Sequence, residues 1–170
     1  MIKIIGIAMV VAAGIGFGSI SPLCLRHRLV VMEQMLSDLT RMRHELNSEH
    51  LSVPELMELM LSFAGNETLA LYRNVHHAMH LNGVACFTDV WQRSVEAELV
   101  ALQSTEREAI GALGEILGQY LLEDQLTAID TVCGKLRESI SSLKTIAENK
   151  MRVSLSFAVA VSLMVAVLLL

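Results

Sequence analysis

Three histidines in five residues are the clearest hint of chemistry in this sequence, in the stretch HHAMH at 76–80. On a helix, His76 and His80 lie one turn apart on the same face, which is the spacing of HExxH zinc sites. A metalloprotease of that kind needs a glutamate base after the first histidine, and His77 stands there instead. The sequence offers no evident third ligand. We therefore place these histidines on the polar side of a helix, assign no metal, and keep a metal enzyme using His76 and His80 as a competing hypothesis.

Other catalytic patterns are missing from the sequence. It contains no GxSxG motif, no glycine-rich phosphate loop and no GxGxxG motif. The carboxylates are scattered at the spacing of a solvated helix surface. Cys24, Cys86 and Cys133 form no CxxC pair, so neither a disulfide framework nor a zinc site is indicated, and a reduced compartment is the simplest interpretation. We predict a protein that is not an enzyme and has no cofactor.

The helices that would position these residues lie between two long uncharged stretches, one near each end of the sequence. Residues 4–25 and 153–170 are stretches of 22 and 18 residues that carry no charged side chain. As helices they would be roughly 33 Å and 27 Å long, close to the thickness of a bilayer core of ~30 Å. We predict transmembrane helices at 1–25 and 153–170. The alternatives are a cleaved secretory signal at the first segment and a buried core helix at the second.

Small residues lie at helical spacing in the first of these segments. Gly14 and Gly18 form a GxxxG pair, which lets two membrane helices approach closely. We predict a helix-packing face at Gly14 and Gly18, directed at the second anchor or at a partner. The alternative is that glycine is simply common in membrane helices.

The region 26–152 is expected to be one acidic domain of 127 residues. It holds all 18 acidic residues and 12 of the 13 basic ones, so its net charge is −6. This charge argues against nucleic acid as the main partner. Arg26 and Arg28 follow the first anchor, and Lys150 and Arg152 precede the second. Positive charges on the inner side of both anchors predict that the domain lies in the cytoplasm.

Apolar residues in this domain recur every three or four positions, which predicts helices almost throughout. One stripe follows the first anchor, with Arg43 filling its single gap, and comprises Leu29, Met32, Leu36, Leu39 and Leu46. Another leads into the second anchor and comprises Leu126, Ile129, Cys133, Leu136, Ile140, Leu143 and Ala147. The two stripes either pack against one another as a coiled coil or face a common bundle core.

Capping signals divide the remainder into shorter helices. Ser52 with Glu55, and Thr105 with Glu108, read as capping boxes, and Pro54 suits a first helical turn. Gly65, Gly83 and Gly118 are predicted helix ends. We predict an all-α fold: a cytoplasmic antiparallel helical bundle of about six helical segments between two transmembrane helices.

This layout and several local stretches resemble the stage III sporulation protein AB family. The closest match is ENKMRVSLSF at 148–157, where the family enters its last anchor. LGEILG at 113–118 resembles a paired-glycine segment of the family, and Gln125 falls where its glutamine does. VWQRS, with Trp91, and Pro54 resemble further family positions. The resemblance covers essentially the whole chain, although Leu121 stands where the family usually has an aspartate, and the tyrosine expected before the proline is missing, with His50 nearby.

The resemblance implies a non-enzymatic membrane subunit of the channel apparatus that joins mother cell and forespore in endospore-forming bacteria. The family is similar to the platform proteins of type II secretion and type IV pilus systems. Implied partners are a secretion-type ATPase and other channel subunits, with the protein in the mother-cell membrane around the forespore. A platform subunit outside sporulation and a two-anchor signalling or adaptor protein are the alternatives, and association of several copies stays open.

A group of acidic residues gives the partner hypothesis a candidate surface. Glu115, Glu123 and Asp124 cluster at a predicted interhelix turn within LGEILGQYLLEDQ. We predict that these carboxylates meet a basic surface of a partner. The alternative is an ordinary solvated turn.

Overall fold

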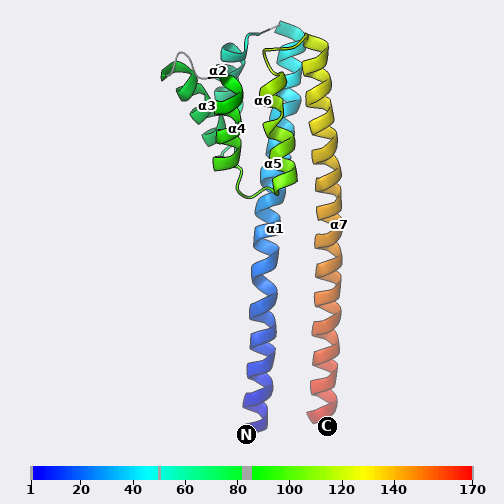
Figure 1. Ribbon diagram of the computed structural model, residues 1–170. Coiled ribbons are helices and arrows are strands. Elements are labelled where there is room, and N and C mark those ends of the chain that lie inside the picture. Colours follow the sequence, from blue (N-terminus) through cyan, green and yellow to red (C-terminus); the bar gives the residue numbers. More distant parts are fainter. Residues whose placement is uncertain (1, 50, 82–85, 170) are drawn as a thin grey trace. The chain divides into compact units, whose positions relative to one another are not determined.

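The computed structural model describes the backbone of residues 2–49, 51–81 and 86–169, and the side chains of residues 24–49, 51–80 and 86–146. Within these ranges all regular secondary structure is helical, which confirms the predicted all-α class (Figure 1). The helices are α1 (Ile2–Glu49), α2 (Val53–Phe63), α3 (Leu69–Leu81), α4 (Phe87–Glu98), α5 (Ser104–Gly111), α6 (Leu113–Ile116) and α7 (Leu122–Leu169).

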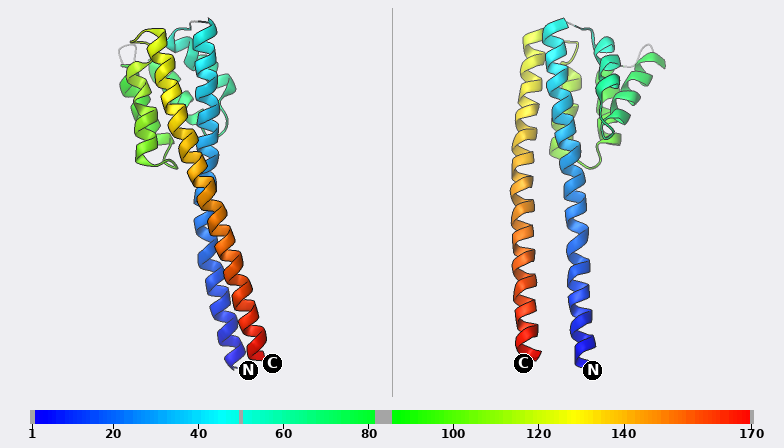
Figure 2. Two further views of the ribbon diagram at one scale, coloured as in Figure 1. Left: turned by 90° about the vertical axis from the view of Figure 1, so that its right-hand side faces the viewer. Right: turned by 180° about the vertical axis from the view of Figure 1, so that it is seen from behind.

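The chain divides into two compact units. One comprises Arg28–Ile140 and therefore holds α2 to α6 together with parts of α1 and α7. The other comprises Met1–His27 and Ser141–Leu170. In this second unit, the N-terminal part of α1 and the C-terminal part of α7 run side by side in each view (Figure 2).

Among the described residues, no helix contains an apolar stretch of the length that spans a bilayer. The predicted membrane segments at 1–25 and 153–170 lie outside the described side chains, apart from Cys24 and Leu25. The predicted packing face at Gly14 and Gly18 also lies outside them.

Within the Arg28–Ile140 unit, α1 and α7 pack antiparallel. Arg43 Nε on α1 lies 2.7 Å from Asp130 Oδ1 on α7, and Thr40 one turn earlier hydrogen-bonds Cys133 one turn later. The predicted stripe of α7 is confirmed from Ile129 to Leu143, where all of its members are buried. Leu126 at its start is half-buried, and the side chain of Ala147 lies outside the described residues.

The buried face of α1 is only partly the predicted one. Its buried apolar residues are Val31, Met32, Met35, Leu39, Met42 and Leu46. Leu29, Leu36 and Arg43 from the predicted stripe are half-buried instead. Met35 and Met42 belong to a second stripe that shares Met32, Leu39 and Leu46 with the first. Both stripes have a 3–4 spacing, so periodicity alone could not choose between them.

The first predicted capping box is confirmed. The backbone N–H of Ser52 donates to Glu55 Oε2 at 2.9 Å, and the Ser52 hydroxyl donates to the same oxygen at 2.6 Å. Pro54 occupies the first turn of α2, where its missing N–H leaves no helical bond unmade. The short hydrogen bonds hold the charged form of Glu55, and they lower the pKa of this carboxyl.

The second predicted capping box is wrong. Helix α5 begins at Ser104, and the residue that caps its backbone is Glu106, whose Oε2 accepts the N–H of Gln103 at 2.9 Å. Glu108 is exposed about half a turn later on the same helix. The segment predicted as one helix up to Gly118 is two, α5 and α6, and Gly118 follows in the turn with φ of 80°. The predicted stop at Gly83 lies outside the described residues.

Candidate functional site

The turn between α6 and α7, residues 117–121, is held in one conformation by Gln125. Gly118 has a positive φ, which side-chain-bearing residues rarely adopt. Its N–H donates to Gln125 Oε1 at 3.3 Å. The Gln125 side-chain amide donates in turn to the carbonyl oxygen of Tyr120 at 2.7 Å. One glutamine in the first turn of α7 therefore fixes both sides of the turn.

A fully buried tryptophan packs against α6, the helix that leads into the turn. Trp91 on α4 donates its indole N–H to the carbonyl oxygen of Ile110 at 2.8 Å, so its polar atom is satisfied inside the core. Gly114 on α6 lies directly against this ring, since a Cβ atom at Gly114 would come within 2.7 Å of Trp91 Cδ1. The hydroxyl of Thr88 donates to the Gly114 carbonyl at 2.9 Å. The close packing at Gly114 and the hydrogen bond from Thr88 thus fix α4 and α6 against each other.

Several of the positions that carry the family resemblance meet in this region. Trp91 contacts Gly114, Gln125 binds Gly118, and Val53, which precedes Pro54, lies against Gly118. A Cβ atom at Gly118 would lie 2.6 Å from Val53 Cγ2. These residues are scattered over more than 70 positions of the sequence, yet they form one packing unit around the turn. Their role in the structure is to build and orient it.

The three predicted partner-binding carboxylates are all exposed. Glu115 lies on α6 before the turn, and Glu123 and Asp124 lie in the first turn of α7. Carboxylates in a first turn interact favourably with the partial positive charge of a helix N-terminus. Exposure leaves these side chains accessible to a partner, but their predicted role in binding stays a prediction.

Two apolar residues that the sequence reasoning missed lie between these carboxylates. Tyr120 is 59% exposed and Leu121 is 77% exposed. The sequence does contain a signal for their exposure. Both residues precede the apolar stripe of α7 and do not continue its 3–4 spacing, so no buried face is predicted to include them. We use the name turn surface for Glu115, Tyr120, Leu121, Glu123 and Asp124.

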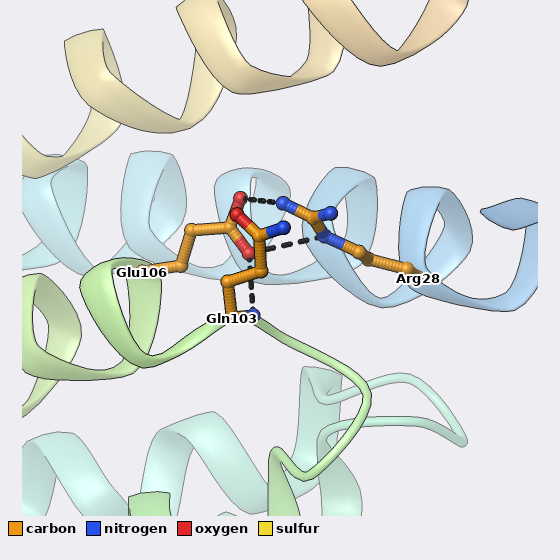
Figure 3. A network of polar contacts seen from close by, with 3 residues as sticks. All are labelled: Arg28, Gln103 and Glu106. Atoms are coloured by element: carbon orange, nitrogen blue, oxygen red, sulfur yellow. Dashed lines mark hydrogen bonds and ion pairs between the residues drawn. The ribbon is translucent and has the colours of Figure 1, made fainter. Parts of the chain in front are cut away.

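A partly buried ion pair connects α1 to α5 (Figure 3). Arg28 contacts Glu106 through two bonds, Nη2 to Oε1 at 2.5 Å and Nε to Oε2 at 3.3 Å. Glu106 is only 6% exposed, and its Oε2 also accepts the N–H of Gln103. The carboxylate therefore has both oxygens satisfied. Such a bidentate pair fixes the orientation of the two helices as well as neutralising a buried charge.

A second buried carboxylate lies between α1 and the turn that precedes α3. Asp38 accepts a hydrogen bond from the Thr68 hydroxyl at 2.5 Å. Burial raises the pKa of Asp38 to about 6, and the bond from Thr68 partly opposes this rise. Tyr72 is fully buried nearby, and its hydroxyl has no hydrogen-bond partner among the described residues. Burial and the negative charge of Asp38 both raise the pKa of Tyr72.

The histidines of HHAMH lie near the C-terminal end of α3. His76 and His80 approach one another, with their Nε2 atoms 3.0 Å apart, while His77 is exposed on a different side of the helix. No group of three or more histidine, cysteine, aspartate or glutamate residues is arranged to hold a metal ion among the described residues.

All three cysteines are free thiols. Cys86 is exposed at the start of α4, where the hydroxyl and backbone N–H of Thr88 lower the pKa of its thiol. Cys133 is buried in the stripe of α7, and burial raises its pKa. The two thiols therefore differ strongly in accessibility.

Comparison with known proteins identifies the family. The family model for stage III sporulation protein AB matches residues 3–170. No curated protein and no solved structure matches the chain. The match extends from the first helix to the last and includes every element that builds the turn surface. The chain belongs to the stage III sporulation protein AB family.

Proposed function

We propose that this protein is a non-enzymatic membrane subunit of the sporulation channel complex, and that it acts there as an assembly platform for a secretion-type ATPase. The observation that carries the proposal is the family match over residues 3–170, which supports a role in sporulation. The platform role and the ATPase partner are what the resemblance to secretion and pilus platform proteins implies.

The proposal includes two membrane anchors. Residues 1–25 and 153–170 would insert in the mother-cell membrane around the forespore, with residues 26–152 in the cytoplasm. The uncharged length of both segments and the basic residues that flank them support this arrangement. The continuous helical backbones of α1 and α7 suit it as well.

The turn surface is the proposed contact with the partner. It combines exposed carboxylates with an exposed tyrosine and leucine, and buried contacts at Trp91 and hydrogen bonds from Gln125 hold its backbone. Ordering the turn in advance lowers the entropy lost on binding. Its charge fits a basic partner surface with an apolar centre, since opposite charges at an interface accelerate association and fix orientation.

A crosslinking purification from sporulating cells tests the proposal. The tagged protein is crosslinked in cells and purified, and its partners are identified by mass spectrometry. Recovery of a secretion-type ATPase with other channel subunits is expected. Recovery of neither, from cells where the protein is present in the membrane, would overturn the platform function.

Charge reversal tests the proposed surface separately. The Glu123→Lys/Asp124→Lys protein should recover less ATPase, and binding by the wild-type protein should weaken as salt rises. The matched control is Asp89→Lys/Glu96→Lys on α4. Asp89 is exposed in a first helical turn, as Glu123 and Asp124 are, and Glu96 is exposed near the C-terminal end of α4. The control therefore changes the net charge by the same amount and removes one carboxylate from a helix N-terminus. Equal recovery from the two variants would place the contact elsewhere on the protein.

A further inference from the structure

The imidazole rings of His76 and His80 lie next to each other, with their Nε2 atoms facing one another. Their Nε2 atoms are 3.0 Å apart, and the ring centroids are separated by 4.3 Å with an edge-to-face angle of 60°. His80 is exposed and His76 is half-buried, so solvent reaches the pair. Without a bound ion, one Nε2–H must donate a hydrogen bond to the other Nε2, because two lone pairs at this distance repel each other.

The same separation suits chelation of a divalent transition-metal ion. A metal–nitrogen distance of about 2.1 Å places two ligands roughly 3.0 Å apart at a right angle and about 3.4 Å apart at the tetrahedral angle. The observed separation lies at the near end of this range. We propose that His76 and His80 form a two-histidine site for a divalent ion that favours imidazole, such as Ni²⁺ or Zn²⁺, with water in the remaining coordination positions.

The fold prepares this site before any metal binds. Leu71, Tyr72 and Val75 on the same helix are fully buried and anchor α3 against its neighbours. The helix then holds His76 and His80 one turn apart on one face. The two ligands therefore do not need to be ordered by the ion. The sequence alone suggested no metal, because it offers no third ligand; the convergence of the two nitrogens is visible only in the structure.

His77 provides an internal control for the site. It is exposed and has the same chemistry as its neighbours, yet it lies about 100° around the helix from His76 and does not join the pair. Removal of His77 keeps the chelating pair, whereas removal of His76 or His80 leaves one imidazole. A single imidazole binds such an ion far more weakly than a chelating pair does.

Calorimetric titration of the full-length protein with NiCl₂ tests the proposal. The wild-type protein and His77→Ala should bind one equivalent of Ni²⁺ with similar affinity. His76→Ala and His80→Ala should each bind it at least tenfold more weakly. Circular dichroism of each variant first verifies that its helical content is unchanged.

Thermal unfolding gives a second readout. A ligand that binds only the folded protein raises its unfolding temperature, so Ni²⁺ should stabilise the wild-type protein and His77→Ala but neither of the other two variants. The proposal is overturned if all four proteins bind Ni²⁺ equally, or if His77→Ala loses as much affinity as His76→Ala. Neither outcome depends on the platform function.

Discussion

At the scale of single residues, two helical glycines have opposite requirements for space: Gly114 has none for a side chain, and Gly134 has room for one. Gly114 lies against Trp91, whereas a Cβ atom at Gly134, on an exposed side of α7, would meet nothing within 4 Å. We predict that Gly114→Ala lowers the free energy of unfolding by about 1–3 kcal/mol, because the extra methyl overpacks the core. Gly134→Ala should raise it by roughly 0.5–1 kcal/mol through the helix propensity of alanine. Urea unfolding monitored by circular dichroism measures both. Equal effects would contradict the packing described for Gly114.

Asp38 gives the protein a predictable response to pH. Its pKa of about 6 in the folded protein exceeds the ordinary value of 3.8 in the unfolded chain. The folded state therefore binds a proton more readily, so this residue's contribution favours folding below about pH 4 and is lost as pH rises through about 6.

We predict that Asp38→Asn removes this part of the pH dependence and raises stability at pH 7 by about 1–3 kcal/mol, since the neutral amide is cheaper to bury and still accepts the bond from Thr68. Unfolding free energies at pH 4.5 and pH 7 measure the effect. Glu58→Gln, at an exposed site on α2, is the control and should leave the difference between the two pH values unchanged. A similar change in both variants would show that Asp38 is not the group responsible.

At the scale of elements, the Glu106 side chain connects α5 to α1, whereas Glu108 makes neither of its contacts. Glu106 caps α5 and binds Arg28 on α1, while Glu108 is exposed one half-turn later. We predict that Glu106→Gln lowers stability by about 1.5–3 kcal/mol, because the half-buried Arg28 loses its charged partner. Glu108→Gln should change it by less than about 0.5 kcal/mol. Denaturant midpoints decide between this assignment and the Thr105–Glu108 capping box, for which the order of the two effects would be reversed.

At the scale of the whole molecule, the accessibility of two cysteines can test the proposed cytoplasmic location of the domain. Cys86 is exposed and Cys133 is only 2% exposed, so the two thiols report accessibility independently of each other. With Cys24 replaced by serine, a membrane-impermeant thiol reagent should label Cys86 in permeabilised cells and leave intact cells unlabelled. Cys133 should react only after unfolding. Labelling of Cys86 in intact cells would place the domain on the opposite side of the membrane from the proposed one.

The sequence by itself determined those features that depend on neighbouring residues. The helical class follows from apolar spacing, the buried stripe of α7 from its regular 3–4 repeat, and the start of α2 from Ser52, Pro54 and Glu55. The family could also be recognised, from the order of anchors and helices along the chain together with several short local stretches. The capping signals and the apolar stripe are each contained within one helix, so they can be read without knowing which helices pack together.

Only the tertiary structure decided the features that join distant residues. Glu106 rather than Glu108 became the capping carboxylate, and its partner Arg28 lies 78 positions away. The choice of Met35 and Met42 over Leu36 for the core of α1, the exposure of Tyr120 and Leu121, and the burial of Asp38 depend likewise on which helices pack together. Periodicity gives a helix its possible faces, but the free energy of burial selects one of them only when a partner helix covers it.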